Sequence, residues 1–403
     1  MAANDSAMYF RKGFGLKADV QQTLATDYSG RLVDLLQTRG YALTAGDTTV
    51  RLAREFGFCY GVERAVEYAY QTRTKFPDRR ILLVGEIIHN PHVNTRLREM
   101  GIEILIPAAA GFDYSAITPQ DVVILPAFGV PMKDFQTLRA TGCVLVDTTC
   151  GSVLNVWKRV DAYARDGLTS LIHGKHYHEE TRATASQAIS HAGAHWIVVR
   201  DMGEAQIVCE YIEGRGNREA FLAKFAPAVS PGFDPDLHLR RIGVANQTTM
   251  LASESLAIGE EIGKAIERAR GAAARAVDFR SFDTICSATQ DRQDAVKELL
   301  AEPLDVMVVV GGYNSSNTIS LAAICAERVT TYHIEDAEAI DPESGTIRHK
   351  PIGRAEEVTA GWMPSHGPVR VGLTAGASTP NNKIGDTVAR VFATRGIDPA
   401  MVE

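Results

Sequence analysis

The feature of this chain that most restricts its fold is a regular alternation of short apolar runs with segments of helical periodicity, from about residue 50 onward. Short runs rich in Val and Ile are typical of strands buried on both faces of a sheet. Apolar residues at helical spacing, as in Val62, Ala65, Val66 and Ala69, indicate a helix with one buried face. The alternation predicts an α/β fold of mostly parallel sheets covered by helices. The expected strands are 81–84, 102–106, 122–125, 144–146, 170–172, 196–199, 242–245, 306–310, 331–334 and 369–373.

A faint internal repeat predicts the domain organisation. Residues 147–150 (DTTC) follow an expected strand and lead into a helix, and residues 283–286 (DTIC) do the same. Cys59 also stands immediately before a helix. We therefore expect three similar α/β domains, 49–149, 150–282 and 283–403, after a more polar N-terminal extension at 1–48. Two stretches rich in Pro and Gly, 226–236 and 341–368, are expected to form surface loops or insertions.

The composition excludes several classes of protein. Six cysteines in 403 residues are too few for a disulfide scaffold. The longest apolar stretch, 122–132, is about half the roughly 20 residues that a membrane helix needs. The net charge of −7 and the absence of Lys/Arg runs argue against a nucleic-acid-binding protein. Because the N-terminus lacks the layout of a signal peptide, we expect a cytoplasmic protein whose thiols stay reduced.

The cysteines fall into two groups. Cys143, Cys209 and Cys325 lie in apolar patterns and are expected to be core residues. The other three stand at turns into helices, where the helix dipole and unpaired amides stabilise a thiolate: Cys59, Cys150 and Cys286. Three distant ligands are compatible with a metal or an iron–sulfur cluster that keeps one coordination position open, as catalysis requires. Unrelated buried thiols are the alternative.

Polar groups follow several of the expected strands. Three histidines, among them His178, directly precede Glu179 and Glu180, which is compatible with acid–base chemistry or with simple complementation of a helix dipole. Two loops with Gly, Ser and Asn, 311–317 and 374–380, have the composition of anion-binding turns, although Ser and Asn also cap helices. Their position after strands predicts a phosphate or diphosphate ligand.

Together these segments closely resemble the 4-hydroxy-3-methylbut-2-enyl diphosphate reductases, the iron–sulfur enzymes that end the methylerythritol phosphate route to isoprenoids. The matching segments occur in family order between residues 57 and 380, and they are GFCYGVERAV, GEIIHNPHV, VDTTCGSV, HEET, NQTT, DTICSATQDRQDAV, GGYNSSNT and TAGAST.

The resemblance implies an oxidoreductase with a trefoil of three α/β domains around a central cavity. In such enzymes a 4Fe–4S cluster with one open iron would be held by Cys59, Cys150 and Cys286. Glu180 would be the proton-delivering acid, with Thr248 beside it. The reaction would be reductive dehydroxylation of the substrate to isopentenyl and dimethylallyl diphosphate, through two one-electron transfers, protonation and loss of water. The diphosphate would lie among His89, His178, Thr248, Ser315, Ser316, Asn317 and Ser378.

One position departs from the family pattern. Many bacterial members carry a histidine in the loop where this chain has Phe128, and phenylalanine offers no hydrogen bond to a phosphate. Phe128 and the long N-terminal extension resemble the plant and cyanobacterial branch. That branch implies ferredoxin as the electron donor, with flavodoxin as the alternative. An oligomer is compatible with the sequence, with 1–48 or 226–236 as candidate interfaces.

Two other classes fit part of the pattern. A zinc-dependent hydrolase acting on a phosphorylated substrate would also use Cys and His ligands. A non-catalytic iron–sulfur sensor would use the cysteines alone. The sensor leaves Glu180 and the two anion-binding loops unexplained.

Overall fold

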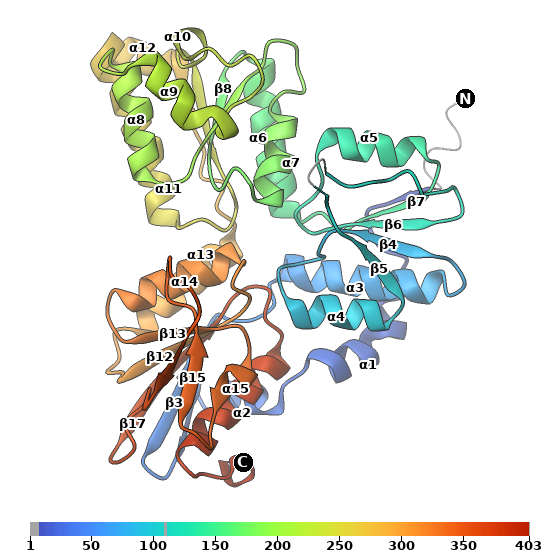
Figure 1. Cartoon of the computed structure of the whole chain (residues 1–403), viewed down its shortest axis with the longest axis vertical. Coiled ribbons are helices and arrows are strands. Elements are labelled where there is room, and N and C mark those ends of the chain that lie inside the picture. Colours follow the sequence, from blue (N-terminus) through green and yellow to red (C-terminus); the bar gives the residue numbers. More distant parts are fainter. Residues whose placement is uncertain (1–7, 109–110, 403) are drawn as a thin grey trace. The chain divides into compact units, whose positions relative to one another are not determined.

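The structure is a computed structural model that describes residues 8–108 and 111–402. All ten expected strands are present, with ends that differ by one or two residues at most, and most pairings between strands are parallel (Figure 1). The prediction of an α/β fold with mostly parallel sheets is confirmed. The described residues form two compact units, one of residues 8–12, 78–85, 103–108 and 111–286, and one of residues 13–77, 86–102 and 287–402.

The first unit contains two sheets. One has the order β1-β7-β6-β4-β5, and the other has the order β11-β10-β8-β9, in which every pairing is parallel. The strands are β1 (Tyr9–Phe10), β4 (Ile81–Val84), β5 (Ile102–Leu105), β6 (Val122–Leu125), β7 (Val144–Asp147), β8 (Thr169–His173), β9 (Trp196–Val199), β10 (Ile242–Asn246) and β11 (Phe279–Ser281). The helices are α5 (Met132–Ala140), α6 (Gly151–Arg165), α7 (Glu179–Gln187), α8 (Met202–Ile212), α9 (Arg218–Phe225), α10 (Pro235–His238), α11 (Ala252–Arg270) and α12 (Ala272–Asp278), with a 3-10 turn at Ala226–Ala228.

The second unit is built on a sheet of order β13-β12-β17-β3-β2, parallel except for the β2–β3 hairpin. Its strands are β2 (Ala42–Ala45), β3 (Thr48–Leu52), β12 (Val306–Val310), β13 (Thr331–Ile334) and β17 (Val369–Ala375). Its helices are α1 (Lys17–Tyr28), α2 (Arg31–Thr38), α3 (Tyr60–Lys75), α4 (Pro91–Glu99), α13 (Ser287–Leu299), α14 (Ser316–Ala326) and α15 (Asn381–Thr394), with 3-10 turns at Ala337–Ala339 and Pro399–Val402. The expected loop at 341–368 contains a small antiparallel sheet, β14 (Ile340–Asp341), β15 (Thr346–His349) and β16 (Glu357–Ala360).

The described part of the N-terminal extension is built into both units. Strand β1 pairs with β7, whereas β3 pairs with β17 over the register Thr48–Val369 to Leu52–Leu373. The predicted boundary at residue 48 therefore falls at the start of a strand that belongs to the sheet of the predicted third domain. The reason is the alternation in β3, where Thr48, Val50 and Leu52 are buried and the residues between them are half-buried. The division into three domains stays a prediction, and residues 1–7 lie outside the described residues.

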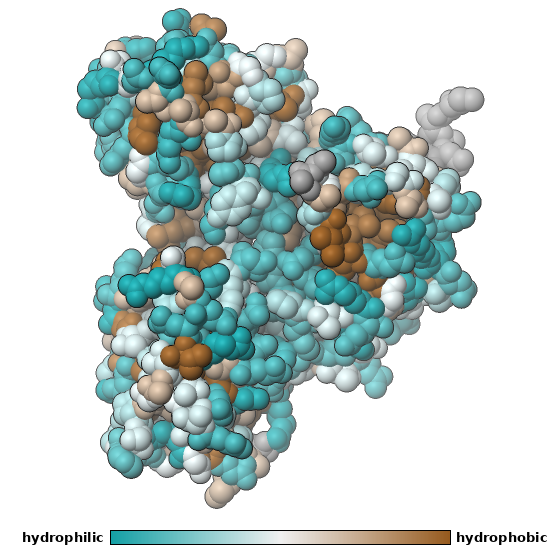
Figure 2. Space-filling model, in the orientation of Figure 1, coloured by the Kyte–Doolittle hydropathy of each residue, from teal (hydrophilic) through white to brown (hydrophobic). Residues whose placement is uncertain are grey.

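The apolar strands carry the core of each unit. In the second unit β12 is buried along its whole length, and the side chains of β17 pack with those of α15 in one hydrophobic cluster. The face in Figure 2 is mostly hydrophilic, with brown apolar residues in scattered groups. Among the described residues, no helix has both the length and the apolar character needed to cross a membrane.

Candidate active site

Each of the three cysteines singled out by the sequence is held at a helix start in the same way. The backbone N–H of Cys150 donates to the carbonyl of Ala127 at 2.9 Å, in the loop after β6. The N–H of Cys286 donates to the carbonyl of Thr248 at 3.3 Å, after β10, and the N–H of Cys59 donates to the carbonyl of Ala377 at 3.2 Å, after β17. Each helix start is thereby tied to the carboxyl end of a buried strand, where ligands of parallel sheets bind.

The DTTC and DTIC segments form the same local turn. The Asp147 carboxylate accepts from the backbone N–H of Thr149 at 2.9 Å, and the Asp283 carboxylate accepts from that of Ile285 at 3.0 Å. Both bonds close the same side-chain turn just before a cysteine. Asp147 also accepts from the Tyr9 hydroxyl at 2.5 Å.

The six cysteines divide by burial as the sequence predicts. All six lie in the described part of the chain, and none forms a disulfide. The three at helix starts are half-buried, whereas Cys143, Cys209 and Cys325 are buried. Burial raises the pKa of Cys209 and of Cys325 to about 12, so these two thiols stay protonated at neutral pH. A protonated thiol is a poor nucleophile and a poor metal ligand.

Thr248 contacts both carboxylate oxygens of the predicted acid, Glu180. Oε1 accepts from the backbone N–H of Thr248 at 2.6 Å, and Oε2 lies 3.0 Å from the Thr248 hydroxyl. Both residues are buried. Gln247 places this loop, because its Oε1 accepts from the Lys175 backbone N–H and from the Thr181 hydroxyl, each at 3.1 Å. The carboxyl group is therefore fixed in position inside a desolvated site.

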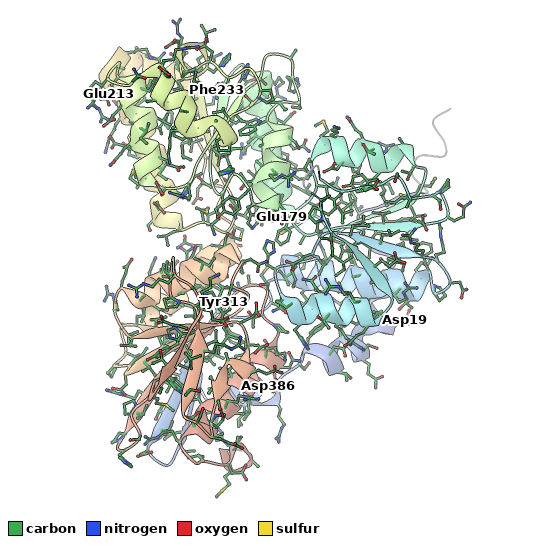
Figure 3. All side chains as sticks on the ribbon, in the orientation of Figure 1. Asp19, Glu179, Glu213, Phe233, Tyr313 and Asp386 are labelled. Carbon is green, nitrogen blue, oxygen red and sulfur yellow. The ribbon has the colours of Figure 1, made fainter. Side chains whose placement is uncertain are left out.

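His178 is the N-cap of α7, and its Nδ1 accepts from the Glu180 backbone N–H at 3.1 Å. With Nδ1 acting as the acceptor, Nε2 is the ring nitrogen left to donate. The ring of Phe128 packs edge-to-face on the imidazole, with centroids 5.6 Å apart. The phenylalanine at position 128, where many bacterial members carry a histidine, thus packs against a predicted substrate-binding histidine. Glu179 begins α7 and is exposed (Figure 3).

The two predicted anion-binding loops meet each other in the second unit. The side-chain oxygen of Asn317 accepts from the Ala377 backbone N–H at 2.8 Å, which ties the loop before α14 to the loop after β17. The Ser378 hydroxyl donates to the backbone carbonyl of His89 at 3.1 Å. Ser315 caps α14, with its hydroxyl accepting from the Thr318 N–H at 3.3 Å, and Ser316 is buried in the first turn.

One buried donor in these loops has no protein partner. Among the described residues, Asn317 Nδ2 has no hydrogen-bond acceptor, although the atom is inaccessible to solvent. A buried unpaired N–H₂ group costs free energy unless a ligand or water accepts from it. An acceptor oxygen brought by a ligand would satisfy this group.

Sequence reasoning passed over three side chains of the site. Glu86 lies 2.9 Å from His89 Nδ1 and also accepts from Asn314, so it orients the imidazole. Arg292 of α13 is buried and donates to the carbonyl of Gly57 at 2.7 Å. The helix that follows Cys286 is thereby anchored on the loop that precedes Cys59. The family segments contain all three residues, Glu86, Asn314 and Arg292. Their spacing gives no sign that they contribute to the site.

The predicted residues form two groups, one in each unit. The first unit holds Cys150, Cys286, His178, Glu180 and Thr248. The second unit holds Cys59, His89, Ser315, Ser316, Asn317 and Ser378. Thiols at helix starts, a buried carboxyl group and polar loops at the ends of parallel strands are features of α/β enzymes.

The chain belongs to the LytB protein family, which it matches over residues 50–392. It is 48% identical over 400 residues to the 4-hydroxy-3-methylbut-2-enyl diphosphate reductase of Thermosynechococcus vestitus (strain NIES-2133 / IAM M-273 / BP-1), covering 98% of this chain and 96% of that protein. It is also 48% identical over 398 residues to the reductase of that name from Gloeobacter violaceus (strain ATCC 29082 / PCC 7421), covering 97% and 94%. These relatives confirm the predicted family, its cyanobacterial branch and an oxidoreductase.

Two solved structures are similar to this chain. One is an (E)-4-hydroxy-3-methyl-but-2-enyl diphosphate reductase described as the terminal enzyme of the non-mevalonate pathway, with a TM-score of 0.52, 28% identity, and coverage of 86% of this chain and 99% of that one. The other is the E-1-hydroxy-2-methyl-but-2-enyl-4-diphosphate reductase from Plasmodium falciparum, with a TM-score of 0.61, 20% identity, and coverage of 85% and 87%. The second likeness bears on the fold alone.

Proposed function

We propose that this chain removes the hydroxyl group of 4-hydroxy-3-methylbut-2-enyl diphosphate reductively, to give isopentenyl and dimethylallyl diphosphate. The balance is R–OH + 2 e⁻ + 2 H⁺ → R–H + H₂O, in which the allylic C–O bond breaks and a C–H bond forms. The observation that carries the proposal is the position of Thr248. This residue binds the Glu180 carboxyl group with its N–H and hydroxyl, and it binds the Cys286 backbone with its carbonyl. A proton donor and a thiol are therefore anchored on one residue.

The three half-buried thiols would be the ligands of a 4Fe–4S cluster. Soft thiolates are the ligands such clusters take, and a helix N-terminus stabilises the thiolate form. The backbone N–H groups of Cys59, Cys150 and Cys286 are anchored in the same way, which supports a shared role as cluster ligands. The other three cysteines are buried and are not suited to this role. The cluster would accept electrons one at a time and would leave one iron without a protein ligand.

The diphosphate would bind to the anion-binding loops. Asn317 Nδ2 offers an N–H without a protein acceptor, and Ser315 and Ser316 stand at the N-terminus of α14, where the helix dipole attracts an anion. His89, oriented by Glu86, and Ser378 extend the polar lining. His178 and Thr248 would contribute from the first unit.

Glu180 and Thr248 would deliver the protons. A dianionic substrate nearby would disfavour a further negative charge, so the acid would be protonated when substrate binds. The Thr248 hydroxyl can accept the carboxyl proton and donate its own, which makes the pair a two-step relay. One proton would go to the leaving oxygen and one to the allylic carbon chain.

The electron donor would be a ferredoxin or a flavodoxin, and we propose that the protein is cytoplasmic. The oligomeric state stays a prediction of the sequence alone.

The test is an anaerobic assay of the purified protein, with its metal content restored, using the hydroxymethylbutenyl diphosphate and reduced methyl viologen. We expect both isoprenoid diphosphates as products. Iron and sulfide analysis should give a cluster, with a brown colour that a zinc protein lacks. Absence of both products from protein that carries the full cluster would overturn the proposal.

A further inference from the structure

An exposed aromatic ring next to Cys286 is covered by an arginine. Phe282 is 40% exposed and directly follows β11. The Arg159 guanidinium of α6 lies 4.0 Å from the centre of this ring, which is the geometry of a cation–π contact. The ring also stacks on buried Tyr163, with centroids 6.4 Å apart and planes 29° from parallel.

The charged group that contacts this ring is a cation, Arg159, in a chain whose net charge is −7. Arg159 and Arg280 both lie close enough to Tyr163 to oppose the rise in its pKa that burial causes. Arg280 pairs with Asp166 at 2.5 Å, whereas among the described residues no carboxylate pairs with Arg159. Arg268 of the same unit, by contrast, pairs with Glu213 and Glu261. Arg159 is thus a cation available to a partner.

Phe282 is joined to Cys286 by a short and rigid segment. Four residues span at most roughly 14 Å when fully extended, and the Asp283 turn shortens that reach. The Thr284 hydroxyl accepts from the Asn246 backbone N–H at 2.8 Å, which holds the segment against the end of β10. Electron transfer slows steeply with distance, so a surface this close to a cluster ligand is suited to electron entry.

We propose that Phe282, Arg159 and Arg280, here called the entry patch, form the docking surface for an acidic one-electron carrier protein. The proposal rests on the function proposed above, which consumes two electrons. Each docked carrier is oxidised as it gives up one electron. Two carriers must therefore dock in each turnover. An acidic carrier is repelled by the net charge of the chain and attracted at this patch, which favours the productive orientation.

The test compares two reductants on the enzyme with its cluster intact. Turnover is measured anaerobically with an acidic [2Fe–2S] ferredoxin kept reduced, and separately with reduced methyl viologen, which needs no docking site. In Arg159→Glu we expect the KM for ferredoxin to rise about tenfold and its dependence on ionic strength to flatten. Phe282→Ala should lower the ferredoxin-driven kcat severalfold. Viologen-driven turnover should stay within twofold in both variants.

Lys133→Glu is the matched control, since it makes the same change in charge at an exposed position on α5 of the same unit. Its ferredoxin kinetics should stay close to those of the parent enzyme. If all three variants keep the parent KM for ferredoxin, or if Lys133→Glu and Arg159→Glu raise it equally, the entry patch is not the docking surface. If the parent enzyme fails with viologen as well, it is the proposed function that fails, and the two failures are thereby distinguished.

Discussion

At the scale of single residues, the position of each polar group decides what it can do. Glu180 is one of two adjacent glutamates, and only the family resemblance, not the local pattern, separates their tasks. In the structure Glu179 is exposed, whereas Glu180 is buried and bound to Thr248 through both oxygens. Only a desolvated, fixed carboxyl group is suited to deliver a proton at neutral pH.

Glu180→Gln should therefore lose at least about a hundredfold in kcat, because the amide keeps the shape and the Thr248 contacts but has no acidic proton. The cluster absorption should be unchanged, since Glu180 is not a predicted ligand. The measurement is turnover with reduced viologen beside the visible spectrum. Loss of colour in this variant would assign Glu180 a structural role instead.

The cysteines allow a paired comparison. Cys59→Ser replaces a thiolate by a hydroxyl, a much weaker ligand for iron, and should lose most of the bound iron and activity. Cys209→Ser alters a buried core thiol and should keep the full iron content, at a modest cost in stability. Iron content per chain after anaerobic purification is the measurement. Equal iron content in both variants would remove Cys59 from the ligand set.

At the scale of elements, the site is built where loops after parallel strands approach one another. Gly376, after β17, lies so close to α14 that an added Cβ would stand 2.0 Å from the Thr318 hydroxyl oxygen. The same loop supplies the Ala377 carbonyl to Cys59 and the Ala377 N–H to Asn317. A glycine is required here by the close approach of the two anion-binding loops, not by its backbone angles.

Gly376→Ala should accordingly lower the free energy of unfolding by about 1–3 kcal/mol through overpacking, and raise the KM for the diphosphate substrate. Gly385→Ala is the control in the same unit, because an added Cβ in α15 meets nothing closer than 3.7 Å. That variant should be neutral or more stable by up to about 1 kcal/mol, since alanine favours a helix. Urea unfolding followed by circular dichroism measures both. Equal stability of the two variants would contradict the crowding argument.

At the scale of the whole molecule, each unit buries a histidine in its sheet. Burial lowers the pKa of His173 in the first unit and of His333 in the second to about 4 each. Below pH 6.5 the unfolded chain takes up a proton at each position, and the folded chain does so only near pH 4. The unfolded state then binds more protons, so the free energy of unfolding falls as the pH drops from about 6.5 to 4.

His333→Gln tests this dependence. The His333 ring contacts the Gly311 carbonyl through Nε2 at 2.9 Å, and an amide can keep a donor there without titrating. The loss of stability between pH 6.5 and pH 4.5 should be smaller in the variant than in the parent, by up to roughly 2 kcal/mol. Urea unfolding at a series of pH values gives the slopes. Identical slopes would mean that His333 titrates normally in the folded state.

Much of the fold and part of the site follow from local pattern. The strands from Ile81 to Ala375 are readable because apolar β-branched runs have few alternatives to a buried sheet. The turns before the cysteines can be predicted because DTTC and DTIC are local motifs. In each, the aspartate carboxylate accepts a hydrogen bond from the backbone N–H two residues further on. The sequence pattern did not predict the β2–β3 hairpin as part of a sheet. The parallel partner of β3 is β17, which lies more than 300 residues away in the chain.

The sequence by itself determined the α/β class, the division of the cysteines and the family, since these depend on residue type and near-neighbour spacing. The tertiary structure alone decided which of two glutamates is buried against Thr248, that Asn317 keeps an unpaired donor, and that Phe128 packs on His178. It also decided that Arg159 covers an exposed ring beside Cys286. Each of these depends on contacts between residues distant in the chain, and burial and pairing arise only when the folded backbone brings them within a few ångströms.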